Sequence, residues 1–138
     1  IIRRRAKDVK AKDFSDYVLG YTCLNDVTAR DIQQHDGQWT RAKSMDGFCP
    51  MGPWAADGVD PSGLKLVTRL NGTVVQQGST ADFITPVPQL LEFITAAMTL
   101  EPGDVIATGT PAGIGSMIPG DQVEVEIEGI GTLKNQVV

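Results

Sequence analysis

The sequence contains no long apolar run, few aromatic residues and only two cysteines. No stretch approaches the roughly 20 apolar residues that a membrane-spanning helix needs, so we expect no membrane association. The N-terminus places charged residues directly after Ile1 and Ile2, which does not match a secretory signal peptide. Cys23 and Cys49 show no zinc-ligand spacing. We therefore expect two reduced thiols in a cytoplasmic protein.

Basic residues are scarce beyond the first dozen positions. Residues 3–12 carry six of the 12 lysines and arginines, whereas residues 14–138 carry 15 acidic and 6 basic side chains. A basic terminal segment can bind nucleic acid, but this one lacks interleaved aromatic residues, and the acidic remainder would repel phosphate. We expect a solvated strand end and no nucleic-acid partner.

Short apolar runs separated by turn residues fill most of the chain. The length of 138 residues suits one compact domain. Two β-rich runs flank Asn71-Gly72, a pair typical of a two-residue hairpin turn. Residues 123–128 alternate apolar and acidic side chains, which predicts a strand with one solvent-exposed face. Residues 129–131 are expected to turn the chain into a last strand. Residues 105–107 predict another short strand.

The helical signal is confined to two segments. Residues 88–99 place apolar side chains on one face, with Pro88 suited to the first turn and Pro102-Gly103 following the segment. Residues 13–19 form a shorter amphipathic segment. One or two packed helices among many short strands predict an α+β, mainly β fold and argue against a doubly wound parallel sheet.

The densest collection of ionisable and amide side chains is NDVTARDIQQHDGQWTRAK, residues 25–43. Asp26 ends an apolar run, where strands commonly deliver side chains into clefts, and a carboxylate suits an oxygen-binding divalent ion. Trp39, Arg41 and Lys43 would share one face if their segment is extended. A lysine in such a place suits an anionic substrate or a nearby charge.

A second candidate is the glycine-rich loop in VIATGTPAGIG, residues 105–115. Its backbone N–H groups and threonine hydroxyls would suit a carboxylate or an enolate. The loop does not match the GxxxxGK[ST] phosphate loop, which argues against nucleotide binding. A tight structural corner explains the same residues equally well, so the local pattern leaves both interpretations open.

Two further stretches have structural interpretations. Residues 44–54, SMDGFCPMGPW, predict an ordered, buried loop from their glycine, proline and aromatic content. Glu124, Glu126 and Glu128 could form a carboxylate metal site, but glutamates on the wet face of a strand are far commoner. His35, the only histidine, is by itself more typical of a surface residue than of a general base.

Five blocks together resemble, in order, the fumarylacetoacetate hydrolase family: GYTCLNDVTARDIQ, QWTRAKSMDGFCPMGPW, LNGTVVQQGSTADFI, LEPGDVIATGTPAGIG and GDQVEVEIEGIGTLKN. The resemblance covers about residues 17–135. It implies a mixed β-sandwich or β-roll domain, usually homodimeric, that binds Mg²⁺ or a similar ion such as Mn²⁺ or Ca²⁺. It also implies an enzyme acting on small 2-keto or 1,3-dicarbonyl acids.

The resemblance implies roles for individual residues. Asp26 matches the metal-ligating aspartate of the family, and Lys43 matches its active-site lysine. The positions that match the substrate pocket are Arg30, Gln33 and Thr110, the last with its neighbour Gly109. Asp31 matches a structural acid, and His35 matches no functional position of the family.

The chain also departs from the family pattern. Two metal-ligating glutamates and a water-activating His/Glu pair match no residue here, and IIRRRAKDV resembles the end of the strand that carries the glutamates. We therefore expect residues 1–138 to be the larger, C-terminal part of a catalytic domain truncated on its N-terminal side. One carboxylate seldom holds Mg²⁺ against water, so we expect this chain alone to be metal-poor and inactive.

Three functional hypotheses follow. The leading one is a metal-dependent hydrolase or lyase acting on C–C bonds of acylpyruvate or fumarylacetoacetate-type acids. The second is an isomerase or decarboxylase of the 2-hydroxyhepta-2,4-diene-1,7-dioate type. The third is a non-catalytic β-domain that binds a small anion or another chain.

Overall fold

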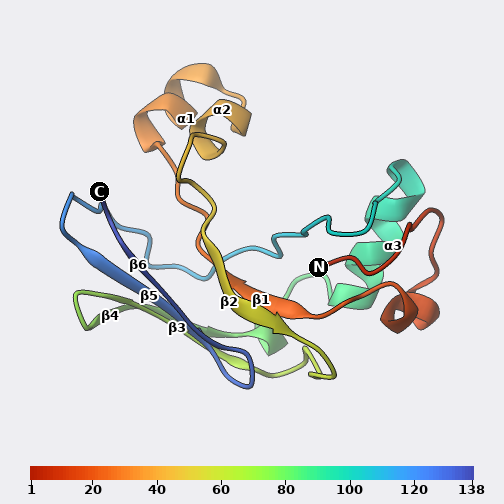
Figure 1. Cartoon of the computed structure of the whole chain (residues 1–138). Helices are drawn as coiled ribbons and strands as arrows, with labels where there is room; N and C mark the ends of the chain where they lie inside the picture. The colour runs from red at the N-terminus through yellow and green to blue at the C-terminus, as the bar shows by residue number, and fades with distance from the viewer.

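The computed structural model describes residues 1–138 and contains two antiparallel sheets with short helices around them (Figure 1). A two-stranded sheet pairs β1 with β2, and a four-stranded sheet has the order β4-β3-β5-β6. The strands are β1 (Tyr21–Leu24), β2 (Met51–Ala56), β3 (Lys65–Leu70), β4 (Thr73–Ser79), β5 (Gln122–Ile127) and β6 (Gly131–Gln136). The predicted α+β, mainly β fold is confirmed.

The β3–β4 hairpin forms where its turn residues predict it. Leu70 pairs with Thr73, and the two residues between them, Asn71 and Gly72, have φ of +51° and +79°. Positive φ at both central positions matches the right-handed twist of the strands, which is why Asn-Gly is so common there. β3 then pairs with β5 on its other side, so this hairpin forms one half of the larger sheet.

Strand β5 has the two faces that its alternating pattern predicts. Val123 and Val125 are buried, whereas Glu124 and Glu126 lie on the opposite face. Glu124 pairs with Lys134 of β6 at 2.7 Å, and Glu126 pairs with Arg69 of β3 at 2.6 Å. The glutamates thus form cross-strand ion pairs, and the chain contains no group of three acidic, histidine or cysteine side chains suited to a metal.

The helices are η1 (Ala11–Asp16), α1 (Arg30–Asp36), α2 (Thr40–Lys43), η2 (Thr80–Asp82) and α3 (Val87–Ala97). Helix α3 lies within two residues of its predicted range, and the early helix is a 3-10 helix. The longest helix has 11 residues, and no helix combines the length and apolarity that crossing a bilayer requires.

The basic N-terminal segment lies against α3 and is ion-paired. Lys7 Nζ donates to the carbonyl oxygens of Thr95 and Ala96 at 3.1 and 2.9 Å, where the last turn of the helix leaves carbonyls free. Its neighbours form surface ion pairs: Arg3–Asp57, Arg4–Asp16, Arg5–Glu101 and Lys10–Glu92. Their charges are therefore largely balanced within the chain.

Two buried clusters form the core. The first joins the N-terminal segment to α3 and consists of Ile2, Ala6, Val9, Leu91 and Leu100. The second lies between the sheets and consists of Cys23, Val125, Ile130 and Leu133. Val18 packs on the first cluster and Tyr21 on the second, so residues 18–21 connect them.

Two local predictions are wrong. Residues 105–107 do not form a strand, because their backbone pairs with no neighbouring strand. Residues 44–54 do not form a buried loop: most of them are exposed, and β2 begins within them at Met51 because it pairs with β1. Cys23 is buried and Cys49 is exposed, and both are free thiols.

Candidate active site

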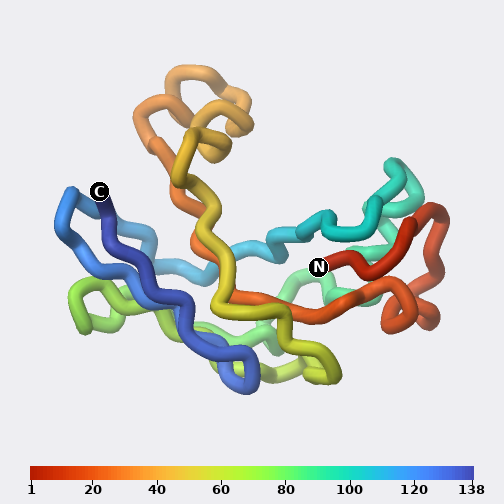
Figure 2. Tube along the Cα trace, in the orientation of Figure 1, coloured from red at the N-terminus to blue at the C-terminus, as the bar shows by residue number.

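Helices α1 and α2 form a protrusion that rises from the β1–β2 sheet (Figures 1 and 2). The chain leaves through β1 and returns through β2, and Asn25 N–H donates to the Pro50 carbonyl at the base, at 3.1 Å. Gly37, with φ of +69°, ends α1 and lets the chain turn into α2. A further bond from Ala29 N–H to the Ala42 carbonyl, at 2.9 Å, closes the protrusion.

Asp26 and Lys43 meet at the base of this protrusion. Lys43 Nζ donates to Asp26 Oδ2 and, at 3.2 Å, to Thr28 Oγ1. Asp26 lies two residues after the end of β1, and Lys43 is the last residue of α2, so the helix pair brings together residues 17 positions apart. Their side chains are 42% and 27% exposed, which leaves both reachable by a small solute.

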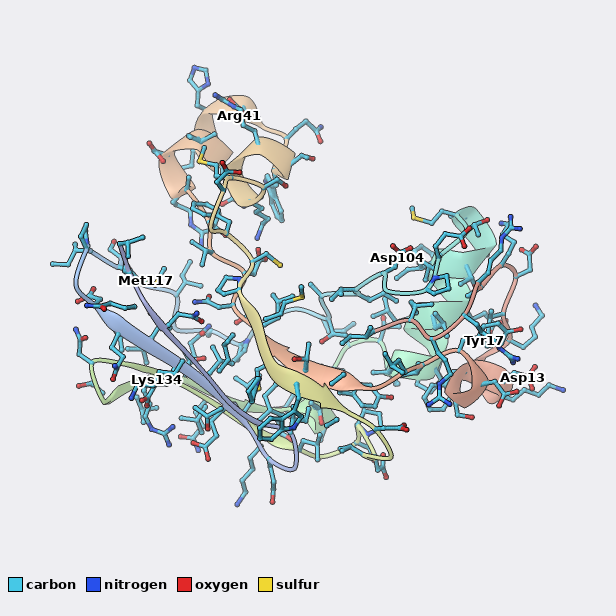
Figure 3. The ribbon with its side chains drawn as sticks, viewed as in Figure 1. Asp13, Tyr17, Arg41, Asp104, Met117 and Lys134 are labelled. Atoms are coloured by element: carbon cyan, nitrogen blue, oxygen red, sulfur yellow. The ribbon has the colours of Figure 1, made fainter.

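The predicted face of Trp39, Arg41 and Lys43 does not form, because their segment is helical rather than extended. Helical spacing brings Lys43 Nζ to 5.9 Å from the Trp39 ring centroid, a cation–π distance. Arg41 instead pairs with Asp36 at the outer part of the protrusion, where Figure 3 labels it. His35 contacts the same Asp36 and is 85% exposed, as expected for a surface histidine.

Arg30 and Gln33 lie one helical turn apart on α1. Arg30 Nη1 donates to Gln33 Oε1 at 2.6 Å, and Gln33 is buried. Arg30 lines the cleft described below, whereas Gln33 lies behind it and holds the guanidinium. Asp31 is exposed in the first turn of α1, where a negative charge suits the helix dipole.

A cleft of about 510 Å³ lies between the base of the protrusion and the glycine-rich loop. Asp26, Thr28 and Arg30 line it on one side, and Thr108, Gly109 and Thr110 line it on the other. Apolar side chains of the larger sheet and Met117 complete its wall. The structure therefore brings Asp26, Arg30, Gly109 and Thr110 to one cavity. Lys43 and Gln33 do not line it, but Lys43 is hydrogen-bonded to Asp26 and Gln33 to Arg30.

The glycine-rich loop lies directly on β4. A Cβ added to Gly78 would stand 3.2 Å from Pro111 Cβ, and one added to Gly113 would stand 2.1 Å from the Val75 carbonyl oxygen. Gln76, between these contacts, donates to Thr110 Oγ1 at 2.9 Å and to the Pro111 carbonyl at 2.8 Å. The backbone N–H groups of Gly109 and Thr110 have no partner in the chain and remain available.

Sequence reasoning did not identify Gln76 as a site residue. Its register opposite the buried Thr68 is the signal that could have found it, because residues paired across two strands share a face of the sheet. The adjacent Gln77 is exposed and makes no side-chain hydrogen bond.

The chain's own residues do not by themselves fit a Mg²⁺ site. Asp26 is the only acidic side chain that lines the cleft, and it is paired with the Lys43 ammonium. Mg²⁺ demands near-octahedral oxygen coordination and gives up its waters reluctantly, so one carboxylate is insufficient. No group of three candidate ligands occurs anywhere in residues 1–138.

Known proteins resemble the chain over its whole length. A family model described as fumarylacetoacetate (FAA) hydrolase C-terminal matches residues 1–138. A 5-carboxymethyl-2-hydroxymuconate delta-isomerase structure from Mycobacterium smegmatis superposes with a TM-score of 0.98 and 51% identity, covering 100% of this chain and 55% of that one. The oxaloacetate tautomerase YisK of Bacillus subtilis is 42% identical over 99% of this chain and 49% of its own length.

A third match is the maleylpyruvate hydrolase of Sphingobium sp. SYK-6, solved in complex with manganese(II) ion and pyruvate. It has a TM-score of 0.90 and 38% identity, covering 100% of this chain and 51% of that one. The chain spans a little over half the length of the first curated relatives it matches.

Proposed function

The chain belongs to the fumarylacetoacetate hydrolase family, and on that premise we propose that it forms the main part of an enzyme acting on small 2-keto or 1,3-dicarbonyl acids. Its relatives include an isomerase, a tautomerase and a hydrolase, named for 5-carboxymethyl-2-hydroxymuconate, oxaloacetate and maleylpyruvate. The last two are 2-keto acids, and the first is the enol form of one. Our leading proposal is C–C hydrolysis of an acylpyruvate-type acid. The observation that supports this proposal is that Asp26, Arg30 and Thr110 line the same cleft, and that Lys43 is hydrogen-bonded to Asp26.

The arrangement suits an enolate, the species that C–C cleavage and isomerisation of such acids have in common. Lys43 supplies positive charge beside the cleft, and preorganised charge stabilises a developing oxyanion. Arg30 can bind the carboxylate of the acid, and Gln33 fixes the orientation of its guanidinium. Gly109 and Thr110 offer donors to another oxygen of the substrate from the opposite side.

We also propose that Asp26 is one ligand of a divalent ion, Mg²⁺ or the chemically similar Mn²⁺ or Ca²⁺, in the full-length protein. The manganese complex of the Sphingobium hydrolase supports this by similarity. Since residues 1–138 bring no second carboxylate to Asp26, the other ligands would have to come from outside them. The roles proposed above for Lys43, Arg30 and Thr110 concern only side chains within residues 1–138.

Isomerisation is a second candidate because the Mycobacterium smegmatis isomerase shares 51% identity with this chain, against 45% for a fumarylacetoacetate hydrolase and 38% for the maleylpyruvate hydrolase. Product mass distinguishes the two reactions. Hydrolysis splits the acid into two smaller acids with uptake of water, whereas isomerisation leaves its mass unchanged.

The test uses the full-length protein with acetylpyruvate and oxaloacetate in the presence of Mg²⁺ or Mn²⁺. We expect Asp26→Ala and Lys43→Ala each to lower kcat/KM by about a hundredfold or more, since each removes charge at the reacting oxygens. Asp26→Ala should also weaken Mn²⁺ binding measured by calorimetry. The matched controls are Asp46→Ala and Lys12→Ala, which change exposed side chains that make no hydrogen bond.

Unchanged rates in Asp26→Ala and Lys43→Ala would contradict the proposed catalytic site. Absence of both turnover and Mn²⁺-linked oxalate binding in the wild type would favour the non-catalytic binding domain.

We further propose that the protein forms a homodimer. Exposed apolar side chains such as Ile84 and Phe93 support this proposal. A monomeric mass measured by light scattering would contradict it.

A further inference from the structure

Gln76 is the one side chain of the sheet that binds the Thr110 loop through two hydrogen bonds. Its Nε2 atom lies 2.9 Å from Thr110 Oγ1 and 2.8 Å from the Pro111 carbonyl oxygen. Gln76 itself lines the cleft, as Thr110 does. The contact therefore lies at the site and joins β4 to a loop more than thirty residues away in sequence.

The Pro111 carbonyl fixes which end of the Gln76 amide faces the loop. A carbonyl oxygen only accepts hydrogen bonds, so the group 2.8 Å away must be the NH₂ and not the amide oxygen. The same NH₂ faces Thr110 Oγ1. The threonine hydroxyl must therefore accept this bond, because the amide nitrogen has no lone pair to offer.

This polarity determines what the Thr110 hydroxyl can do. A hydroxyl carries one proton, and the bond from Gln76 uses an oxygen lone pair and leaves that proton free. Thr110 makes no other side-chain hydrogen bond. Its proton is thus available to an acceptor in the cleft, alongside the free N–H groups of Gly109 and Thr110.

We propose that Gln76 is a positioning residue that makes the Thr110 hydroxyl a hydrogen-bond donor toward an anionic oxygen in the cleft. This inference rests on the proposed function, in which that oxygen belongs to the keto acid. Gln76 acts through Thr110 and the loop, and its polarity selects an acceptor-rich ligand such as a carboxylate or enolate.

The packing of the loop supports a fixed position for Thr110. Pro111 lies against Gly78, and Gly113 lies against the backbone of Val75, so β4 contacts the loop on both sides of the Gln76 amide. A donor held in place before the substrate arrives costs no reorganisation during the reaction.

The test compares Gln76→Leu and Gln76→Glu in the full-length protein, with Gln77→Leu and Gln77→Glu as controls. Gln77 is adjacent, exposed and without side-chain hydrogen bonds. Readouts are kcat/KM for oxaloacetate and the affinity for oxalate in the presence of Mn²⁺. We expect Gln76→Leu to lose roughly tenfold to a hundredfold in both, the usual range for a residue that orients a ligand-binding group.

Gln76→Glu should lose at least as much at pH 8, because a carboxylate accepts the Thr110 proton and turns it away from the ligand. Its activity relative to wild type should rise as the pH falls toward the ordinary glutamate pKa of about 4.3, since a protonated carboxyl can donate. The same ratio for Gln76→Leu should stay flat. If Gln76→Leu does not fold, this pH dependence decides the matter.

A double-mutant cycle separates positioning from simple loop support. In a Thr110→Val background, Gln76→Leu should cause no further loss, because the hydroxyl through which it acts is gone. If Gln76→Leu causes an equal loss with and without Thr110, the inference is overturned. It is also overturned if Asp26→Ala abolishes activity while both Gln76 variants behave like the wild type. A wild type without turnover or oxalate binding would overturn the proposed function and this inference together.

Discussion

At the residue scale, the clearest electrostatic effect lies outside the cleft, at Asp36. Arg41 donates to both carboxylate oxygens, from Nε at 2.7 Å and from Nη2 at 2.6 Å. These hydrogen bonds, with a smaller contribution from His35, lower the pKa of Asp36 from 3.8 to about 2. A bidentate pair of this kind fixes geometry as well as charge, so it helps join α1 to α2.

We expect Arg41→Ala to return the pKa of Asp36 toward 3.8, measured by NMR titration of its side-chain carboxyl carbon. Since the folded state holds this pKa low, the pair stabilises the fold fully above about pH 4, and the contribution disappears as the pH falls through about 2. Arg30→Ala is the control because Arg30 contacts Gln33 and not Asp36. A pKa of about 2 retained in Arg41→Ala would show that another group is responsible.

The residues of the site were predictable to different extents. The composition of residues 25–43 indicated the region of Asp26 and Lys43, and the family resemblance supplied their proposed roles. The contact between Asp26 and Lys43 could not be predicted from the local sequence. It depends on α1 and α2, which are too short to show a helical periodicity of apolar residues. Gln76 was missed for a related reason: its role depends on where a distant loop packs.

At the scale of elements, hairpins were predictable and irregular segments were not. Asn71-Gly72 and the alternation of residues 123–128 encode their strands locally, through turn conformation and period-two patterning. Residues 105–107 have the composition of a strand, but a strand also needs a partner backbone, and no strand pairs with them. Met51 shows the reverse case, since pairing with β1 makes a strand of a segment that reads as a loop.

The contact between the glycine-rich loop and β4 gives a prediction at this scale. Gly113 has φ of +107° and would place a Cβ 2.1 Å from the Val75 carbonyl oxygen. Gly103 has a similar φ of +94° with open space around its Cβ position. Alanine should therefore strain the backbone at both sites, by about 1–2 kcal/mol, but should displace a neighbouring strand only at position 113.

If the proposed activity holds, we expect Gly113→Ala to lower kcat/KM of the full-length protein well beyond Gly103→Ala, because it moves the loop that carries Thr110. Thermal unfolding of both variants measures the shared backbone cost. Equal activities of the two variants would mean that the loop tolerates movement away from β4.

At the scale of the whole molecule, the chain exposes more surface than a compact domain of its mass. Its accessible area is 8603 Å², whereas a compact monomer of 14.8 kDa exposes about 7,000 Å². The trace in Figure 2 shows the reason: the protrusion stands away from the sheets, and the α3 region lies at the opposite end from β6. The fold therefore depends on two small clusters rather than on one central core.

These clusters make the single-domain prediction testable. Leu91 and Leu133 are buried in different clusters, and each substitution by alanine should lower the free energy of unfolding by about 2–5 kcal/mol. Because residues 18–21 pack on both clusters, we expect one cooperative transition that either variant shifts as a whole. Circular dichroism and hydrogen exchange provide the measurement. If Leu91→Ala releases the amides of α3 while those of β5 and β6 keep their full protection, the two clusters unfold independently and the chain is not one cooperative unit.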